Sequence, residues 1–303
     1  MRKLLLGLLL VAAPANALIR FPNTSALTPY AVVSVGSTAS FNQNSGPITG
    51  KLLVGQGSTV SSSGGGNGSI TGGAYGDNQT QLNNLRGLQT DPTLNLVTAS
   101  DTLAAYNQAL ALADFANALA ATQTSAGAIT GTRTLTNTGA VTITNPNGPA
   151  TSLSVIDFTS LSNSTLTISG GANDFFVLRT SGNFSTNRTI ALTGGVTADR
   201  ILWVMNGTSG NIFQTSGGNN LIGTFLATKG GNFQFSAIQL TGKLINTAGH
   251  IQFVSNSTMT DGGLTVPVDP VPEPAAWTML IGGFMLVGQM ARRQQQAARV
   301  RAA

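Results

Sequence analysis

The sequence predicts a mainly β protein, a parallel β-solenoid (β-helix-like) body with one packed α-helix. Short runs that alternate apolar and small polar residues recur along the chain, and 37 glycines among 303 residues punctuate them. Only 8% of the residues are charged while 41% are hydrophobic, so the chain can bury a core. A repeated four-residue motif and a single Ala- and Leu-rich segment complete the pattern.

The strand pattern begins at about residue 28 and dominates from residue 129 to residue 266. Because alternate residues of a strand share a face, Phe233, Phe235, Ile238, Leu240 and Leu244 are expected to point inward. Strands at roughly 8–12-residue spacing indicate a sandwich, a barrel or a solenoid. The expected strands include residues 134–136, 141–144, 165–168, 175–178, 190–192, 201–205, 221–226, 233–240, 244–245 and 251–254.

The repeat favours the solenoid. Residues 49–52 read Thr-Gly-Lys-Leu and recur at residues 241–244, and Phe41 and Phe233 each precede their copy by eight residues. Two coils built to one plan are typical of a solenoid, in which each coil buries its apolar side on its neighbours. The copies are far apart in the sequence, so the N-terminal coil is free to lie beside the C-terminal one.

Residues 101–121 predict the helix, because they are rich in Ala and Leu and contain neither Gly nor Pro. Ser100 or Asp101 is expected to cap its start. Its apolar stripe is expected to pack on the sheet. That stripe comprises Leu103, Tyr106, Leu110, Leu112, Ala113, Phe115 and Leu119.

Residues 1–17 have the form of a secretory signal peptide with a short signal helix. A basic start is followed by an apolar run, and Ala15 and Ala17 form a small-x-small cleavage site. Ten apolar residues are too few to span a bilayer. We therefore expect export through the secretion machinery, and a mature body that begins at residue 18.

The C-terminus, residues 272–303, has a fixed order of parts. Pro272, Glu273 and Pro274 come first, and residues 275–290 form an uncharged stretch that includes Trp277. Arg292 and Arg293 follow, with further arginines behind them. As a helix, the uncharged stretch spans about 24 Å, short of the roughly 30 Å hydrocarbon core. The residues alone indicate a short tail anchor with the body outside the cell.

This order of parts, with Gly282, Gly283 and Phe284 in the apolar stretch, resembles the PEP-CTERM sorting signal of exported proteins in Gram-negative bacteria. The resemblance implies recognition of Pro-Glu-Pro by an exosortase-type membrane protease, transient association with the inner membrane, and removal of the tail. It implies a destination at the cell surface or outside the cell, mostly in producers of exopolysaccharide.

The body between the ends, residues 18–271, gives little material for catalysis. Its nine basic residues balance its nine Asp, so it lacks the basic footprint of a nucleic-acid-binding protein. Cysteine is absent and His250 is the only histidine, expected at a surface turn. We expect no cofactor and no metal site. The Gly-rich residues 72–77 faintly match a calcium repeat but occur once, which indicates a turn.

The body also resembles the secreted β-solenoids of the choice-of-anchor A and ice-binding-like families. Residues 48–55, 100–107 and 221–228 carry the resemblance, with an early coil, a helix and a run of late coils in the same order. Choice-of-anchor A domains are regarded as adhesins, so the resemblance implies a surface role.

The sequence therefore predicts an exported, non-catalytic surface or extracellular-matrix protein, adhesive or associated with exopolysaccharide. The first alternative is ice binding, which needs a flat, uncharged and regular face. Thr-x-Thr pairs occur, for example at Thr134 and Thr258, but they do not recur at one coil period. A polysaccharide-active enzyme is the lesser alternative. A flat threonine face would favour ice binding, and a cleft with paired Asp would favour the enzyme.

Overall fold

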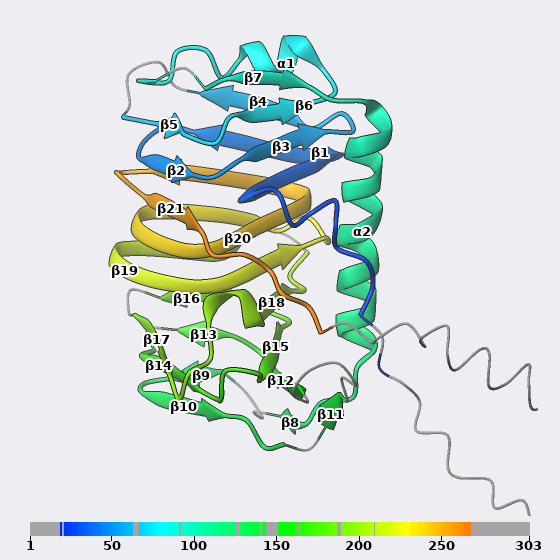
Figure 1. Ribbon diagram of the computed structural model, residues 1–303. Helices are drawn as coiled ribbons and strands as arrows, with labels where there is room; N and C mark the ends of the chain where they lie inside the picture. Colours follow the sequence, from blue (N-terminus) through cyan, green and yellow to red (C-terminus); the bar gives the residue numbers. More distant parts are fainter. Residues whose placement is uncertain are drawn as a thin grey trace, which may run out of the picture.

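The computed structural model describes residue 19 and residues 21–62, 67–90, 92–124, 128–139, 141–143, 151–162, 164–186, 189–208 and 210–267. The expected signal peptide and C-terminal sorting segment, with their two helices, lie outside these residues. The body is a β-solenoid whose strands pair in parallel from coil to coil, as the sequence predicts (Figure 1).

Each full coil has three faces, which the chain visits in a fixed order. The helix face, against which helix α2 packs, contains β3 (Leu52–Gly55), β6 (Ala74–Gly76), β7 (Leu94–Leu96), β8 (Gln123–Thr124), β12 (Thr151–Phe158), β15 (Phe175–Thr180) and β18 (Ile201–Met205). The second face contains β4 (Thr59–Ser62), β9 (Ile129–Thr130), β13 (Leu161–Ser162) and β16 (Phe184–Thr186). The third contains β2 (Pro47–Thr49), β5 (Ser69–Ile70), β10 (Arg133–Thr136), β14 (Leu166–Ser169), β17 (Ile190–Thr193) and β21 (Thr258–Asp261).

Three long strands bend around the corners and contribute to more than one face. They are β1 (Val32–Gln43), β19 (Asn211–Ala227) and β20 (Asn232–Val254). β11 (Val141–Ile143) pairs antiparallel with β12 at one end of the solenoid. Two short elements are additional to the expected helix: α1 (Gln79–Asn83) and the 3-10 turn η1 (Ala198–Arg200).

The first coils of the chain lie beside the last, because β1 pairs in parallel with β20. Val32 pairs with both Leu52 and Leu244, and Thr260 pairs with both Thr49 and Thr241. The two Thr-Gly-Lys-Leu copies therefore occupy equivalent corners of different coils. The repeat found in the sequence is confirmed as a structural repeat.

The inside of the coils holds the main hydrophobic core. Phe233, Phe235, Ile238, Leu240 and Leu244 are all buried, which confirms their expected inward direction. Phenylalanines from successive coils pack on one another behind the second face. The Phe184 and Phe213 rings stack with centroids 4.5 Å apart, and the Phe235 and Phe253 rings are tilted with centroids 5.1 Å apart. Bulky rigid rings in register give that face a stiff backing.

Helix α2 (Ala99–Ala118) lies along the helix face (Figure 1). Thr98, rather than Ser100 or Asp101, caps its start, and Asp101 completes a capping box with Thr98. The expected apolar stripe is right in part: Leu112 and Ala113 are buried, but Leu103 is 44% exposed. Ala105, Ala109 and Ala116, which the stripe did not include, are buried as well. Small side chains let the helix approach the sheet closely, so four alanines and Leu112 make up most of its buried side.

Candidate functional site

The third face carries a file of threonines across neighbouring coils. Thr241, Thr260 and Thr49 stand side by side in the strand register, and all three are exposed. Thr71 follows β5 and continues the file at one end. Towards the other end, Thr136, Ser169 and Thr193 stand in register on β10, β14 and β17. We call this surface the threonine face.

A second file runs parallel to the first, two residues earlier on each strand. Its members are Thr134, Thr167, Ala191, Asn220, Gln239, Thr258, Pro47 and Ser69. Neighbouring strands lie about 4.8 Å apart, and residues i and i+2 lie about 6.8 Å apart along a strand. The two files therefore form a grid of mostly small side chains, with Ile222 of β19 between Thr241 and the β10–β14–β17 strands. Buried Ile48, Leu240 and Met259 lie directly behind the residues of β2, β20 and β21.

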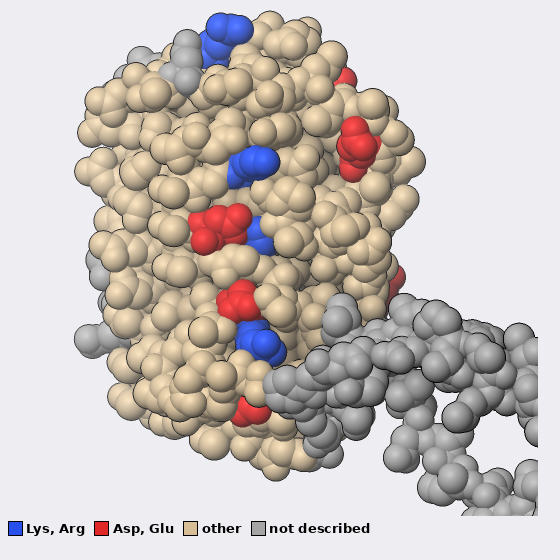
Figure 2. Space-filling model, in the orientation of Figure 1, with Lys and Arg blue, Asp and Glu red and all other residues tan. Residues whose placement is uncertain are grey.

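Charged side chains gather at the edge of this grid rather than on it. Figure 2 shows them in a file down the middle of the view, with uncharged surface beside them over β2, β5 and β21. This file follows the turns that lead from the threonine face to the helix face. The corners between these two faces contain Lys51, Asp174, Asp199, Arg200 and Asp261, with Lys243 buried behind Asp261.

The second face carries longer polar side chains that bond to one another. Its outward file consists of Thr130, Ser162, Ser185, Gln214, Gln234, Gln252, Asn42 and Ser61, and we call it the amide face. Asn211 Nδ2 donates to Gln234 Oε1 at 2.9 Å, and Gln234 Nε2 donates to Gln252 Oε1 at 3.4 Å. Gln234 and Gln252 therefore use part of their hydrogen-bonding capacity within the protein.

His250 lies on the amide face within β20, not at the surface turn that the sequence led us to expect. It is half-buried, and its Nδ1 lies 2.6 Å from Ser40 Oγ. Burial lowers the pKa of His250, because the charged imidazolium would lose solvation there. Among the residues that the structure describes, no charged side chain pairs with His250, and the residue lies within strand β20.

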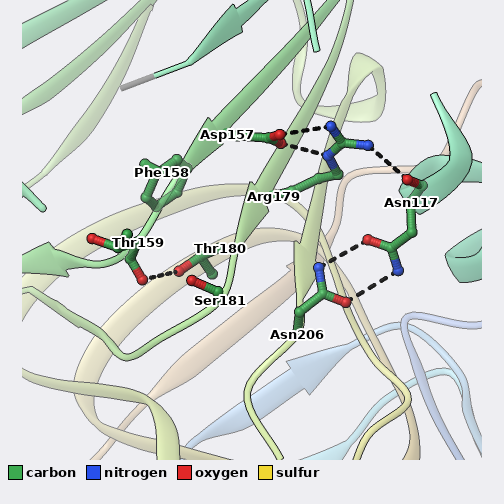
Figure 3. Close-up of a pocket in the computed structure, with 8 residues that line it drawn as sticks. All are labelled: Asn117, Asp157, Phe158, Thr159, Arg179, Thr180, Ser181 and Asn206. Carbon is green, nitrogen blue, oxygen red and sulfur yellow. Dashed lines mark hydrogen bonds and ion pairs between the residues drawn. The ribbon is translucent and has the colours of Figure 1, made fainter. Parts of the chain in front are cut away.

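An open pocket of about 370 Å³ lies near the C-terminal end of α2 (Figure 3). Asp157 and Arg179 form a two-pronged ion pair, and Arg179 Nη1 also donates to the carbonyl oxygens of Ala116, Asn117 and Leu119. Asn117 and Asn206 exchange two amide hydrogen bonds. The hydrogen bonds from Arg179 therefore fix the C-terminal end of α2. Asp157, the one carboxylate that lines the pocket, is already paired with Arg179.

The structure also bears on the metal, calcium-repeat and membrane-span questions raised by the sequence. Within the described ranges, no group of three or more His, Asp or Glu side chains gathers to hold a metal ion. The Gly-rich residues 72–77 include strand β6, and Asp77 Oδ2 accepts from the backbone N of Gln56 and from Thr102 Oγ1. Asp77 thus ties α2 to the coil. No helix in the described part of the chain is long and apolar enough to cross a membrane.

The predicted processing residues cannot be compared with the structure. Ala15, Ala17, Pro272, Glu273, Pro274, Trp277, Gly282, Gly283, Phe284, Arg292 and Arg293 all lie outside the described residues. The two threonine files, by contrast, were not predicted from the sequence. The pairs come from coils that are distant in the sequence, such as β2 and β21, so no single period along the chain contains them.

Solved structures with the same fold come from ice-binding proteins. No family model matches the chain, and no curated protein matches its sequence. The ice-binding protein_1 DUF3494 domain of Shewanella frigidimarina superposes with a TM-score of 0.54 at 16% identity, covering 80% of this chain and 98% of that one. An ice-binding protein from an Antarctic biological consortium gives 0.53 at 19%, covering 82% and 95%.

A third match is the ice-binding protein of the Antarctic ascomycete Antarctomyces psychrotrophicus. Its TM-score is 0.51 at 17% identity, covering 78% of this chain and 97% of that one. At such identities the likeness establishes a shared fold. The expected adhesive or exopolysaccharide-associated role is contradicted by these matches, because the solved relatives in fold are ice-binding proteins and favour the alternative.

Proposed function

We propose that this protein binds ice, without catalysis, through its threonine face. The observation that carries the proposal is the in-register file of exposed threonines at Thr241, Thr260 and Thr49, flanked by a second file of mostly small residues. Proteins of the same fold bind ice according to their descriptions, which supports this use of the face.

The chemistry of threonine suits a solid water surface. Each side chain presents a methyl group and a hydroxyl group, and its branched Cβ restricts χ1, so little side-chain freedom is lost on binding. The β-strand grid repeats these pairs at fixed intervals. Waters held at such intervals already resemble a lattice, whereas a charged group would orient water around itself. The charged file at the edge leaves the grid neutral.

The amide face suits ice less well. Glutamine side chains are longer and have more rotamers than threonine, so fixing them costs more entropy. Gln234 already accepts from Asn211 and donates to Gln252. We therefore assign the ice contact to the threonine face.

A steric substitution tests this assignment. Thr241→Tyr and Thr260→Tyr should raise the concentration that stops ice recrystallisation by roughly tenfold, equivalent to about 1.4 kcal/mol. Thr59→Tyr is the matched control, because Thr59 is also an exposed strand threonine but lies on β4 at the amide face. Gln214→Tyr tests the centre of the amide face.

The outcomes separate the two surfaces. Loss of activity with Thr59→Tyr or Gln214→Tyr alone would move the ice contact to the amide face. A wild-type protein that neither shapes ice crystals nor slows recrystallisation would refute ice binding. Thermal unfolding of each variant, followed by circular dichroism, checks that the coil remains folded.

We further propose that the protein is exported from a Gram-negative cell and sorted by a PEP-CTERM-type tail. The supporting residues are the signal-like start with Ala15 and Ala17 and the ordered tail from Pro272. Mass spectrometry of the native extracellular protein should find neither residues 1–17 nor the segment after about Pro274. A C-terminal peptide containing Arg292 on most molecules would instead indicate a retained anchor.

A further inference from the structure

The threonine face is interrupted near its middle. On β19, Ile222 pairs with Thr241 and so occupies the position that threonine or serine holds in the other strands of that file. The companion position is Asn220, which pairs with Gln239 on the next strand. A branched hydrocarbon and two long amides thus stand where the other strands carry mostly small residues.

The interruption is built into the fold. Ile222 is half-buried against the core, and its carbonyl oxygen accepts a hydrogen bond from Trp203 Nε1 at 2.9 Å. Gly223 follows with a φ of +114°, and a Cβ there would meet Trp203 Nε1 at 2.9 Å. This stretch of β19 is therefore held by the buried indole. On the far side of it, β10, β14 and β17 form a three-stranded sheet of their own.

Two regular surfaces result. The upper patch comprises Thr71, Thr49, Thr260 and Thr241, and the lower patch comprises Thr134, Thr136, Thr167, Ser169 and Thr193. Each patch has its own ladder, which fixes its internal spacing. The spacing between the patches is set by the strand that carries Ile222, not by a ladder of threonines.

We propose that the two patches bind ice as separate sites on one rigid body. This inference rests on the proposed function. Two weak contacts joined by a stiff solenoid reinforce each other, because engagement of one patch holds the other close to the crystal. The overall affinity then depends on both patches, and each retains partial binding when the other is blocked.

Blocking each patch separately by substitution tests the inference. Thr260→Tyr disables the upper patch and Thr193→Tyr the lower one, and Thr59→Tyr is the control from the other face. Each single variant should lose roughly tenfold in ice adsorption, and the double variant should lose far more than either. Ile222→Thr fills the gap in the file, and it should leave adsorption within roughly twofold, since the patches act separately.

Results that would overturn the two-patch inference can be told apart from results that would overturn ice binding itself. If Thr193→Tyr adsorbs like the wild type, or if Thr260→Tyr alone abolishes adsorption, only one patch binds and the inference is wrong while ice binding stands. A clear gain from Ile222→Thr would indicate one continuous site and would likewise overturn it. Absence of adsorption by the wild type removes the proposed function and this inference together.

Discussion

Lys243 is a fully buried lysine whose ammonium is held by three acceptors. Its Nζ lies 2.8 Å from the Thr28 carbonyl oxygen, 2.7 Å from that of Tyr30 and 2.8 Å from Asp261 Oδ1. Burial lowers the pKa of Lys243, and the carboxylate of Asp261 acts against this shift. The side chain therefore fastens the N-terminal segment and the end of β21 to one corner of the coil.

Lys243→Met should lower the free energy of unfolding by about 3–5 kcal/mol. The variant leaves the carboxylate of Asp261 and two backbone carbonyl oxygens without their donor. The matched control is Lys51→Met. Lys51 holds the same place in the other Thr-Gly-Lys-Leu copy, but it is exposed over the Tyr75 ring. That variant should lose about 1 kcal/mol or less. Urea unfolding measures both, and equal losses would contradict the anchoring role.

His250 predicts a pH dependence of stability. Its pKa in the folded protein lies below the ordinary value of 6.5, so the unfolded chain binds the proton more readily. The stabilising effect is complete above pH 6.5 and is lost as the pH falls through the lower folded pKa. The wild type should therefore lose stability on acidification below pH 6.5 more steeply than His250→Gln. Parallel pH curves for both proteins would refute this.

At the level of elements, the helix–sheet contact is sensitive to side-chain size. Ala109 of α2 is completely buried against the helix face, while Ala111, two residues on, is exposed. Ala109→Leu should cost about 1–3 kcal/mol through overpacking. Ala111→Leu should change stability by less than about 0.5 kcal/mol, as surface substitutions do. Thermal unfolding compares the two, and similar melting temperatures would mean that the helix packs by another side.

The same contact shows what the sequence could and could not predict. Composition and the lack of Gly and Pro gave the helix and nearly its bounds, but the hydrophobic pattern favoured Leu103 over Ala109. Hydrophobicity ranks residues by transfer to an apolar environment, whereas a close helix–sheet approach selects for small volume. Alternation along single strands predicted the inward phenylalanines correctly, because that signal is local.

The threonine files needed information that no local pattern contains. Thr49 and Thr260 become neighbours through pairing between strands from opposite ends of the chain. The environment of His250 likewise depends on Ser40, 210 residues away. The burial and the hydrogen bonds of these residues depend on which strands pair and in what register. The pairing between coils is set by the packing of the whole core, which no local stretch of sequence contains.

At the level of the whole molecule, continuous pairing predicts a single cooperative unfolding transition. The β1–β20 pairing joins the early coils to the late ones, and α2 packs on strands of both groups. Trp203 is buried among the late coils, stacked on Phe225 at 5.5 Å. In a Trp277→Phe chain, Trp203 fluorescence and circular dichroism should therefore report the same urea midpoint. Two separated midpoints would show that the early coils unfold independently.

The β1–β20 pairing also governs the order in which the molecule is completed. A chain that emerges N-terminus first presents β1 long before β20, its partner, has left the ribosome or a translocation channel. Until then one edge of the early coils has no strand to pair with, and their inward-facing side chains lack their final neighbours. The pairing of β1 with β20 therefore forms only after almost the entire chain has emerged. Passage through a narrow pore before folding is complete is thus compatible with the topology itself, whatever chaperones assist it.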